Sequence, residues 1–218
     1  MPGFNIHLSV AKRYAEKHNE IKNLDDFYKG ALAPDLVENK KVSHYTTLED
    51  KNNLVKHLEN KVSLENYLKS SSVKPDYEKG VFLHLITDYL FFNKFFEKEY
   101  LKNVSFNEFW NDLYYSYDET NEYLVKKYGI DYNSISSKVT DNVNKNKASR
   151  NLSTSNKNIL DISKLDRFIE EVSDVSLKEY ENKILKKIEK NKVKIREATI
   201  EDVENRVIKF VCTGLRVT

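Results

Sequence analysis

The chain of 218 residues has little glycine and almost no cysteine. Its five glycines lie far apart in the sequence, so none belongs to a glycine-rich phosphate loop of the Rossmann or P-loop type. The single cysteine, Cys212, excludes an internal disulfide framework and a thiolate zinc cluster. Its apolar neighbours predict a small core residue.

The chain also lacks a charge excess and a long apolar run. Thirty-six basic and 34 acidic residues give a net charge of +2, without the concentrated basic excess of a nucleic-acid-binding protein. The longest apolar run is far shorter than the roughly 20 residues of a transmembrane helix. The N-terminal segment has no basic region followed by an apolar stretch, so it does not resemble a signal peptide. We therefore expect a cytoplasmic protein with no transmembrane segment.

Helical periodicity runs through almost the whole sequence, and no strand pattern is convincing. The fold class predicted is all-α, a multi-helix bundle around an apolar central helix at 77–101. A first helix is expected over 6–18, with Asn5 as its N-cap. A second, over 24–32, ends near Ala33 because proline at the next position disfavours helical geometry. Further helices are expected at 47–58, 62–70, 105–127, 163–190 and 199–211, with Gly129 closing the third of these and Ser163 and Thr199 capping the last two.

The composition divides the chain into three parts. Residues 1–132 are predicted to form a helical metal-binding core, for the reasons given below. Residues 133–158 are rich in Ser, Asn and Lys with few large apolar side chains, which predicts a long loop. Residues 159–218 are predicted to form C-terminal helices that pack on the same domain.

The most informative pair of residues is His84 and Asp88 in the central helix. At a spacing of four their side chains share one helix face, with Cβ atoms about 5–6 Å apart. An imidazole and a carboxylate so placed can bind one metal ion. An unpaired carboxylate inside an apolar helix is costly, so some group must satisfy it. A metal ion, an ordinary hydrogen bond, or an Arg or Lys side chain would each do so.

Three other residues are candidates for the same site. His7 lies near the start of the first helix, Asp35 follows a proline whose fixed φ presents the carboxylate stiffly, and His44 lies in a polar loop. Each of them also has an ordinary structural interpretation without a ligand role. His7 would be a helix residue, Asp35 a turn or cap residue, and His44 an exposed loop histidine. His18 and His57 lie among charged residues, and we expect them on the solvated surface.

Four segments together resemble the zinc-dependent phospholipase C family. The resemblance covers about the first 95 residues and runs in the order His, Asp, His, His-x-x-x-Asp. It rests on these segments: Met1-Pro2-Gly3-Phe4 to His7, Gly30-Ala31-Leu32-Ala33-Pro34-Asp35, Ser43-His44-Tyr45 and His84-Leu85-Ile86-Thr87-Asp88. The resemblance implies an all-helical bundle that holds metal ions and hydrolyses phosphate esters.

The resemblance also implies roles for single residues. It assigns one metal site to His44, His84, Asp88 and Asp35, and it has His7 share Asp88 in holding a second ion. Asp35 would bridge to the attacking water or accept a proton from it. The family continues with further His and Glu ligands, whereas no histidine follows residue 84 here and position 94 is lysine. At most two of the three family metals are therefore expected.

The leading prediction is a reduced, cytoplasmic, metal-dependent hydrolase that cleaves a phosphate mono- or diester with metal-activated water. Imidazole and carboxylate ligands suit zinc, and also Mn, Fe or Ni, in one or two ions. The first alternative is a non-catalytic metal-binding or scaffold protein on the same fold. A second is an interaction module that uses aromatics such as Tyr114 and Tyr117. A third is a nucleotide phosphohydrolase similar to HD-domain proteins, although the adjacent His-Asp dipeptide is absent and Asp118 is expected to be an exposed helix carboxylate.

Overall fold

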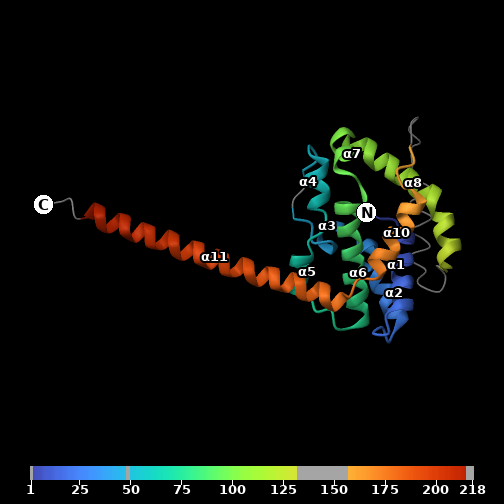
Figure 1. Cartoon of the computed structure of the whole chain (residues 1–218), viewed down its shortest axis with the longest axis horizontal. Helices are drawn as coiled ribbons and strands as arrows, with labels where there is room; N and C mark the ends of the chain where they lie inside the picture. Colours follow the sequence, from blue (N-terminus) through green and yellow to red (C-terminus); the bar gives the residue numbers. More distant parts are fainter. Residues whose placement is uncertain (1, 48–49, 132–156, 215–218) are drawn as a thin grey trace. The chain divides into compact units, whose positions relative to one another are not determined.

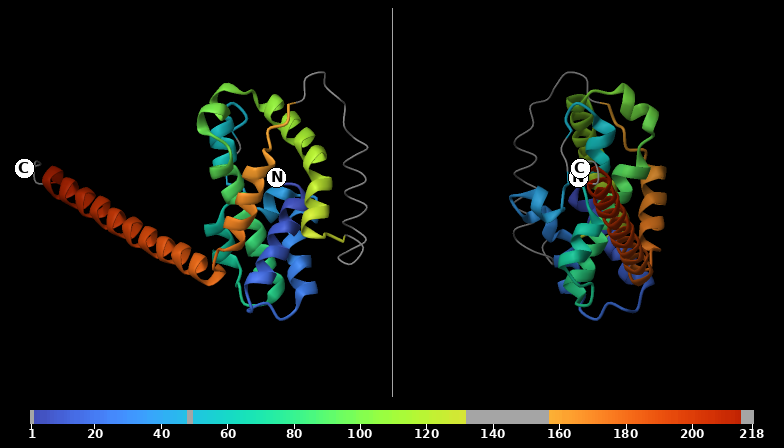
Figure 2. Two further views of the ribbon diagram at one scale, coloured as in Figure 1. Left: turned by 45° about the vertical axis from the view of Figure 1, so that its right-hand side comes forward. Right: turned by 90° about the vertical axis from the view of Figure 1, so that its left-hand side faces the viewer.

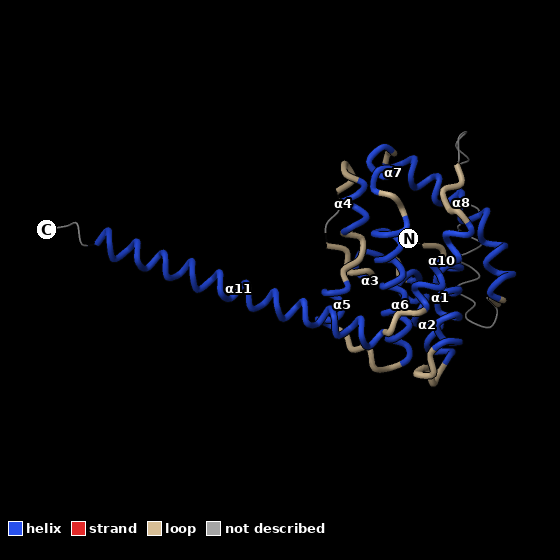
Figure 3. Tube along the Cα trace, viewed as in Figure 1, coloured by secondary structure: helices blue, strands red, loops and turns tan. Residues whose placement is uncertain are grey.

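The computed structural model describes residues 2–47, 50–131 and 157–214, without the side chains of 195, 197–198, 200 and 202–214. These residues form helices and connecting loops with no strand among them, which confirms the predicted all-α class (Figure 3). Almost all of the predicted loop at 133–158 lies outside the described residues. The side chain of Cys212, which was predicted to be a small core residue, also lies outside them. None of the described helices is both long enough and apolar enough to cross a bilayer. In order the elements are α1 (Phe4–Lys17), α2 (Leu24–Leu36), α3 (Lys40–Ser43), α4 (Leu54–Glu59), α5 (Leu64–Ser70), α6 (Asp76–Leu90), η1 (Phe91–Phe95), α7 (Lys98–Asn103), α8 (Phe106–Tyr128), α10 (Ile162–Ser173) and α11 (Leu177–Gly214).

The chain divides into two compact units, Met1–Leu177 and Lys178–Thr218. Most of the second unit is one helix, α11. In the first, α1, α2 and α6 contact one another, and α10 packs against α1 and α6 (Figures 1 and 2). The predicted placement of 159–218 on one domain with the metal-binding core stays a prediction.

Two glycines let α2 and α6 touch backbone to backbone. A Cβ atom on Gly30 would lie 2.0 Å from the Tyr77 carbonyl oxygen, and one on Gly80 would lie 2.1 Å from the Phe27 carbonyl oxygen. Both distances are far shorter than any real contact, so only glycine permits this approach. The contact fixes the relative position of two helices that carry candidate site residues.

Several helix ends agree with the sequence. α8 begins after Ser105, whose hydroxyl accepts a hydrogen bond from the amide of Glu108. It ends at Tyr128, and Gly129 is its C-cap with a left-handed φ of +58°. α5 lies within the expected range 62–70 and is capped by Ser63.

Near the N-terminus, three predicted boundaries are wrong. Gly3, not Asn5, is the N-cap of α1, and Asn5 is a buried helix residue that donates to the Asn121 side chain. α2 continues through Pro34 to Leu36, because packing against α1 and α6 outweighs the loss of one backbone hydrogen bond near the helix end. The polar loop before residue 45 contains the short helix α3, and helix 47–58 is reduced to α4.

The predicted central helix at 77–101 is three elements. α6 ends at Leu90, a π-helical turn spans Phe91–Phe95, and α7 starts after an extended residue at Phe96. All four phenylalanines from 91 to 96 are buried, and their rings contact one another. A continuous α-helix would point some of these rings to solvent, whereas the wider turn and the break at Phe96 bury them all.

The C-terminal helices also differ from the prediction. α10 is capped by Asp161, which accepts from the amide of Lys164, and not by Ser163. The helix expected over 163–190 breaks after Ser173, where the Lys17 ammonium binds the Ser173 hydroxyl. α11 then passes without interruption through Thr199, so no separate helix begins there.

Candidate metal centre

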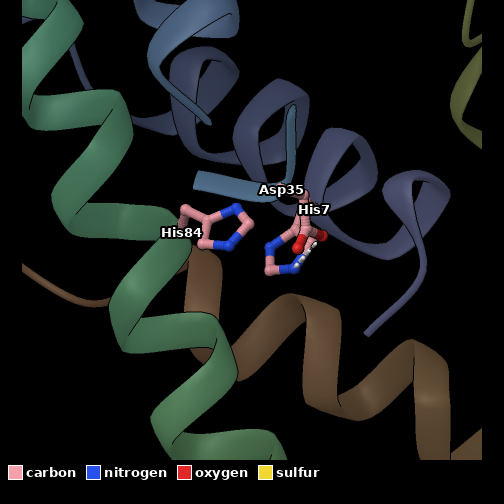
Figure 4. Close-up of side chains that lie close together, drawn as sticks. All are labelled: His7, Asp35 and His84. Carbon is pink, nitrogen blue, oxygen red and sulfur yellow. Dashed lines mark ion pairs between the residues drawn. The ribbon is translucent and has the colours of Figure 1, made fainter. Parts of the chain in front are cut away.

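The five candidate ligands come together in one buried cluster. His7 lies on α1, Asp35 near the end of α2, His44 directly after α3, and His84 and Asp88 on α6. Asp35 is 7% exposed and the other four are 0–1% exposed. Figure 4 shows the side chains of three of them, His7, Asp35 and His84, pointing toward one another from separate helices.

His44, His84 and Asp88 form the first group that can hold a metal ion. The Nε2 atoms of His44 and His84 are 3.1 Å apart, and Asp88 Oδ2 lies 3.0 Å from the first and 3.7 Å from the second. A tetrahedral zinc ion at about 2.0–2.1 Å from its ligand atoms holds them about 3.3–3.4 Å apart. The three distances bracket this value, so the donor atoms fit one face of such a coordination sphere.

Backbone carbonyls determine which nitrogen of each imidazole faces the cluster. His84 Nδ1 donates to the Ala31 carbonyl oxygen at 2.8 Å, and His44 Nδ1 donates to the Lys40 carbonyl oxygen at 2.8 Å. A carbonyl oxygen can only accept, so each neutral ring carries its hydrogen on Nδ1 and presents a lone pair at Nε2. With both rings in this neutral form, the two Nε2 lone pairs face each other and the Asp88 carboxylate. A cation would satisfy all three atoms.

His7 and Asp35 complete the cluster around this group. His7 Nε2 is 3.3 Å from Asp88 Oδ1 and 3.9 Å from Asp35 Oδ2, while Asp35 Oδ1 is 3.6 Å from His44 Nε2. Among the described residues, the two nitrogens of His7, both oxygens of Asp88 and Oδ1 of Asp35 are buried without a hydrogen-bond partner. So many unsatisfied polar atoms in one place are rare in protein interiors. They fit a site for metal ions.

Protonation of the cluster suits a divalent cation. Burial alone would raise the pKa of Asp35, but His84 and Lys40 outweigh it and lower that pKa. Burial likewise opposes ionisation of Asp88, but His84 and His44 hold its pKa well below the ordinary value. The pKa of His84 is lowered to about 3, chiefly by burial. Two ionised carboxylates and a neutral imidazole are the forms that bind metal.

Other residues considered in the sequence lie elsewhere. Asp118 is exposed on α8, as expected. His57 is 3% exposed and packs edge-on against Phe106, so its expected place on the solvated surface is wrong. His18 is also not free in solvent, because it stacks on Tyr14 and its Nε2 lies 2.9 Å from the Ser173 carbonyl oxygen.

Two features of the neighbourhood were missed in the sequence. Lys40 Nζ lies 3.5 Å from Asp35 Oδ1. The position of Lys40 four residues before His44 would have indicated this proximity if α3 had been expected.

Tyr117 is 4% exposed whereas Tyr114 is 44% exposed, so the two aromatics do not form one exposed surface. Burial raises the pKa of Tyr117 well above its ordinary value, and Tyr114, Asp88 and Asp35 add to the effect.

Comparison with protein-family models, curated proteins and solved structures finds no match to this chain. Its function is therefore inferred from the cluster itself.

Proposed function

We propose that the protein is a metal-dependent hydrolase that cleaves a phosphate mono- or diester, as in the zinc-dependent phospholipase C family that its motifs resemble. The observation that carries the proposal is the convergence of three imidazoles and two ionised carboxylates in one buried cluster, where several polar atoms have no hydrogen-bond partner among the described residues. A structural hydrogen-bond network would pair these atoms with donors. Divalent cations bound here would satisfy the acceptor atoms that face one another in the cluster.

The ligands divide between two ions. His44, His84, Asp88 Oδ2 and Asp35 Oδ1 would hold the first, and His7 with the second oxygen of each carboxylate would hold the other. The rings of His7 and His84 are stacked with their centroids 3.7 Å apart and their planes 10° apart. Donor atoms of His7, Asp35 and His84 are close enough to form one group, but a single ion cannot lie in the planes of two rings stacked at this spacing, so the two histidines suit separate ions.

The chain's own groups then have distinct tasks in hydrolysis. A divalent ion bound here would polarise a phosphoryl oxygen and lower the pKa of its water toward about 7. Asp35 is the ligand with the largest exposed fraction, and its lowered pKa keeps its carboxylate ionised, so it would orient that water by accepting a hydrogen bond from it. The carbonyl oxygens of Ala31 and Lys40 keep His84 and His44 oriented, since each fixes one ring nitrogen as a donor.

Elemental analysis of protein purified without a histidine tag tests the site. We expect one or two equivalents of Zn, Mn, Fe or Ni in the wild type, and loss of the metal in His84→Ala and Asp88→Ala with helical circular dichroism retained. Asp118→Ala removes an exposed carboxylate from α8 and should keep the metal. Hydrolysis of p-nitrophenyl phosphate and bis-p-nitrophenyl phosphate should follow the metal content. Wild-type protein that binds no metal after incubation and desalting contradicts the proposal.

The burial of the cluster favours one further candidate, a non-catalytic metal-binding protein. Four of the five ligands are at most 1% exposed, and structural metal sites are typically closed to solvent. This candidate predicts metal that stabilises the fold, without hydrolysis of either ester in the presence of any of the four metals. Hydrolysis that disappears in His84→Ala would exclude it.

A further inference from the structure

One edge of the cluster lies closer to solvent than the rest. Asp35 is 7% exposed, whereas His7, His44, His84 and Asp88 are 0–1% exposed. The Lys40 ammonium lies 3.5 Å from Asp35 Oδ1, and the side chain of this lysine is 49% exposed. The half-exposed side chain of Lys40 therefore lies beside the most exposed of the five candidate ligands.

Lys40 combines a fixed backbone with a loosely held side chain. Its carbonyl oxygen accepts a hydrogen bond from His44 Nδ1, and α3 begins at this residue. Its ammonium, in contrast, is 3.5 Å from the carboxylate, longer than the roughly 2.7–2.9 Å of a charge-assisted hydrogen bond. Asp35 Oδ1 accordingly has no hydrogen-bond partner among the described residues. The ammonium can turn outward while the backbone that holds His44 stays in place.

A metal ion and the Lys40 ammonium compete for the same carboxylate oxygen. A divalent cation bound to Asp35 Oδ1 repels an ammonium only a few ångströms away. The half-exposed side chain can relieve this repulsion by turning toward solvent, where it adds a positive charge at the edge of the site. Lysine is a common phosphate ligand in proteins because it offers such a point charge.

We infer that Lys40 binds the anionic phosphoryl oxygens of the substrate at the Asp35 edge of the site. The inference rests on the proposed function and adds to it a substrate-binding residue and the direction of substrate entry. Inorganic phosphate is the simplest probe, because it carries the phosphoryl oxygens and no leaving group. Its binding can be measured whether or not the protein hydrolyses the esters tested.

The experiment compares three variants of the metal-loaded protein with the wild type. Lys40→Met removes the charge and keeps most of the length, Lys40→Arg keeps the charge, and Lys41→Met removes a charge from the next position of α3 as a control. Titration calorimetry with inorganic phosphate should show binding at least 10-fold weaker in Lys40→Met, and within about 3-fold of wild type in the other two. For a hydrolysed ester, Lys40→Met should raise KM by a similar factor with a smaller change in kcat. Its metal content should not fall, because the substitution removes a competitor of the metal and none of its ligands.

The outcomes separate this inference from the proposed function. Metal-loaded wild type that does not bind phosphate, or binds it as Lys40→Met does, overturns the role of Lys40 and leaves the metal centre intact. Loss of metal in Lys40→Met also overturns it, because the residue then supports the ligands and not the substrate. An equal loss of phosphate affinity in Lys41→Met shows a general charge effect and contradicts the inference. A wild type without metal removes both proposals together.

Discussion

The sharpest test of how the fold positions the metal centre is Gly80→Ala. Gly80 lies on α6 against the backbone of α2, one helical turn before His84. A Cβ atom there would lie 2.1 Å from the Phe27 carbonyl oxygen and 2.7 Å from the Ala31 amide nitrogen. Both obstacles are backbone atoms of a helix, so they cannot rotate away. The two helices must separate instead.

The size of the effect follows from these distances. Ordinary contact begins near 3.4 Å, so the 2.1 Å approach requires a displacement of roughly 1 Å. Overpacking of this kind costs about 3 kcal/mol, and the better helix propensity of alanine offsets about 1 kcal/mol. The net loss of about 2 kcal/mol should lower Tm by roughly 4–8 °C. The same displacement moves His84 away from Asp35 and weakens metal binding by 10-fold or more, because ligands must stay within about 0.5 Å of their places.

Thermal unfolding by circular dichroism and competition with a chromophoric chelator measure the two effects. Gly3→Ala is the matched control, since its Cβ atom would meet only the Tyr117 ring at 3.5 Å. As Gly3 is the N-cap of α1, we expect this change to cost about 1 kcal/mol or less and to leave metal binding intact. If Gly80→Ala has the wild-type Tm and metal affinity, the glycine contact does not position His84 and the reasoning fails.

Three further predictions concern helix ends and pH. Pro34→Ala restores an N–H that can donate to the Gly30 carbonyl, which stabilises the fold by about 0.5–1.5 kcal/mol. It also removes the restriction that proline places on the unfolded chain, which destabilises the fold by a similar amount. The free energy of unfolding in urea and the metal affinity should therefore change little. Gly129→Ala places a Cβ atom at a φ of +58° and should cost roughly 1–2 kcal/mol in urea unfolding, with Gly129→Asn less damaging. Burial alone would raise the pKa of Asp76, but Lys79 and two backbone amides that donate to it lower that pKa below 3.8. Its contribution is therefore present above pH 3.8 and lost as the pH falls through the lowered value. Asp76→Asn should destabilise by about 1–2 kcal/mol at pH 7 and progressively less below pH 3.8 in acid-unfolding curves.

Two of the five candidate ligands were predictable because local spacing constrains them. His84 and Asp88 share a helix face at any position in a bundle, so their proximity needs no tertiary information. The convergence of His7, Asp35 and His44 onto that face was different. It could be predicted only from the family resemblance, since nothing in the sequence alone brings three distant segments to one helix.

The failures have a common physical origin in tertiary packing. Four closely spaced phenylalanines predict a continuous apolar helix, but burying all of their rings requires the turn at Phe91–Phe95 and the break that follows. His57 has charged neighbours in the sequence, yet its ring is covered by Phe106 of a helix about 50 positions away. Local composition carries no record of such contacts. The same limit explains why Lys40 was not expected beside Asp35.

The continuation of α2 through Pro34 matters for function, because it explains how Asp35 reaches the cluster. In a helix Ala31 and Asp35 are one turn apart and share a face. The Ala31 carbonyl oxygen holds His84 Nδ1, so the helix aligns the Asp35 carboxylate with the same imidazole. If the helix ended at Ala33, this alignment would be lost, and only the fixed φ of Pro34 would orient the Asp35 carboxylate. Helical continuity, and not the fixed φ of proline, is therefore what presents Asp35, and the tolerance of metal binding to Pro34→Ala follows directly from it.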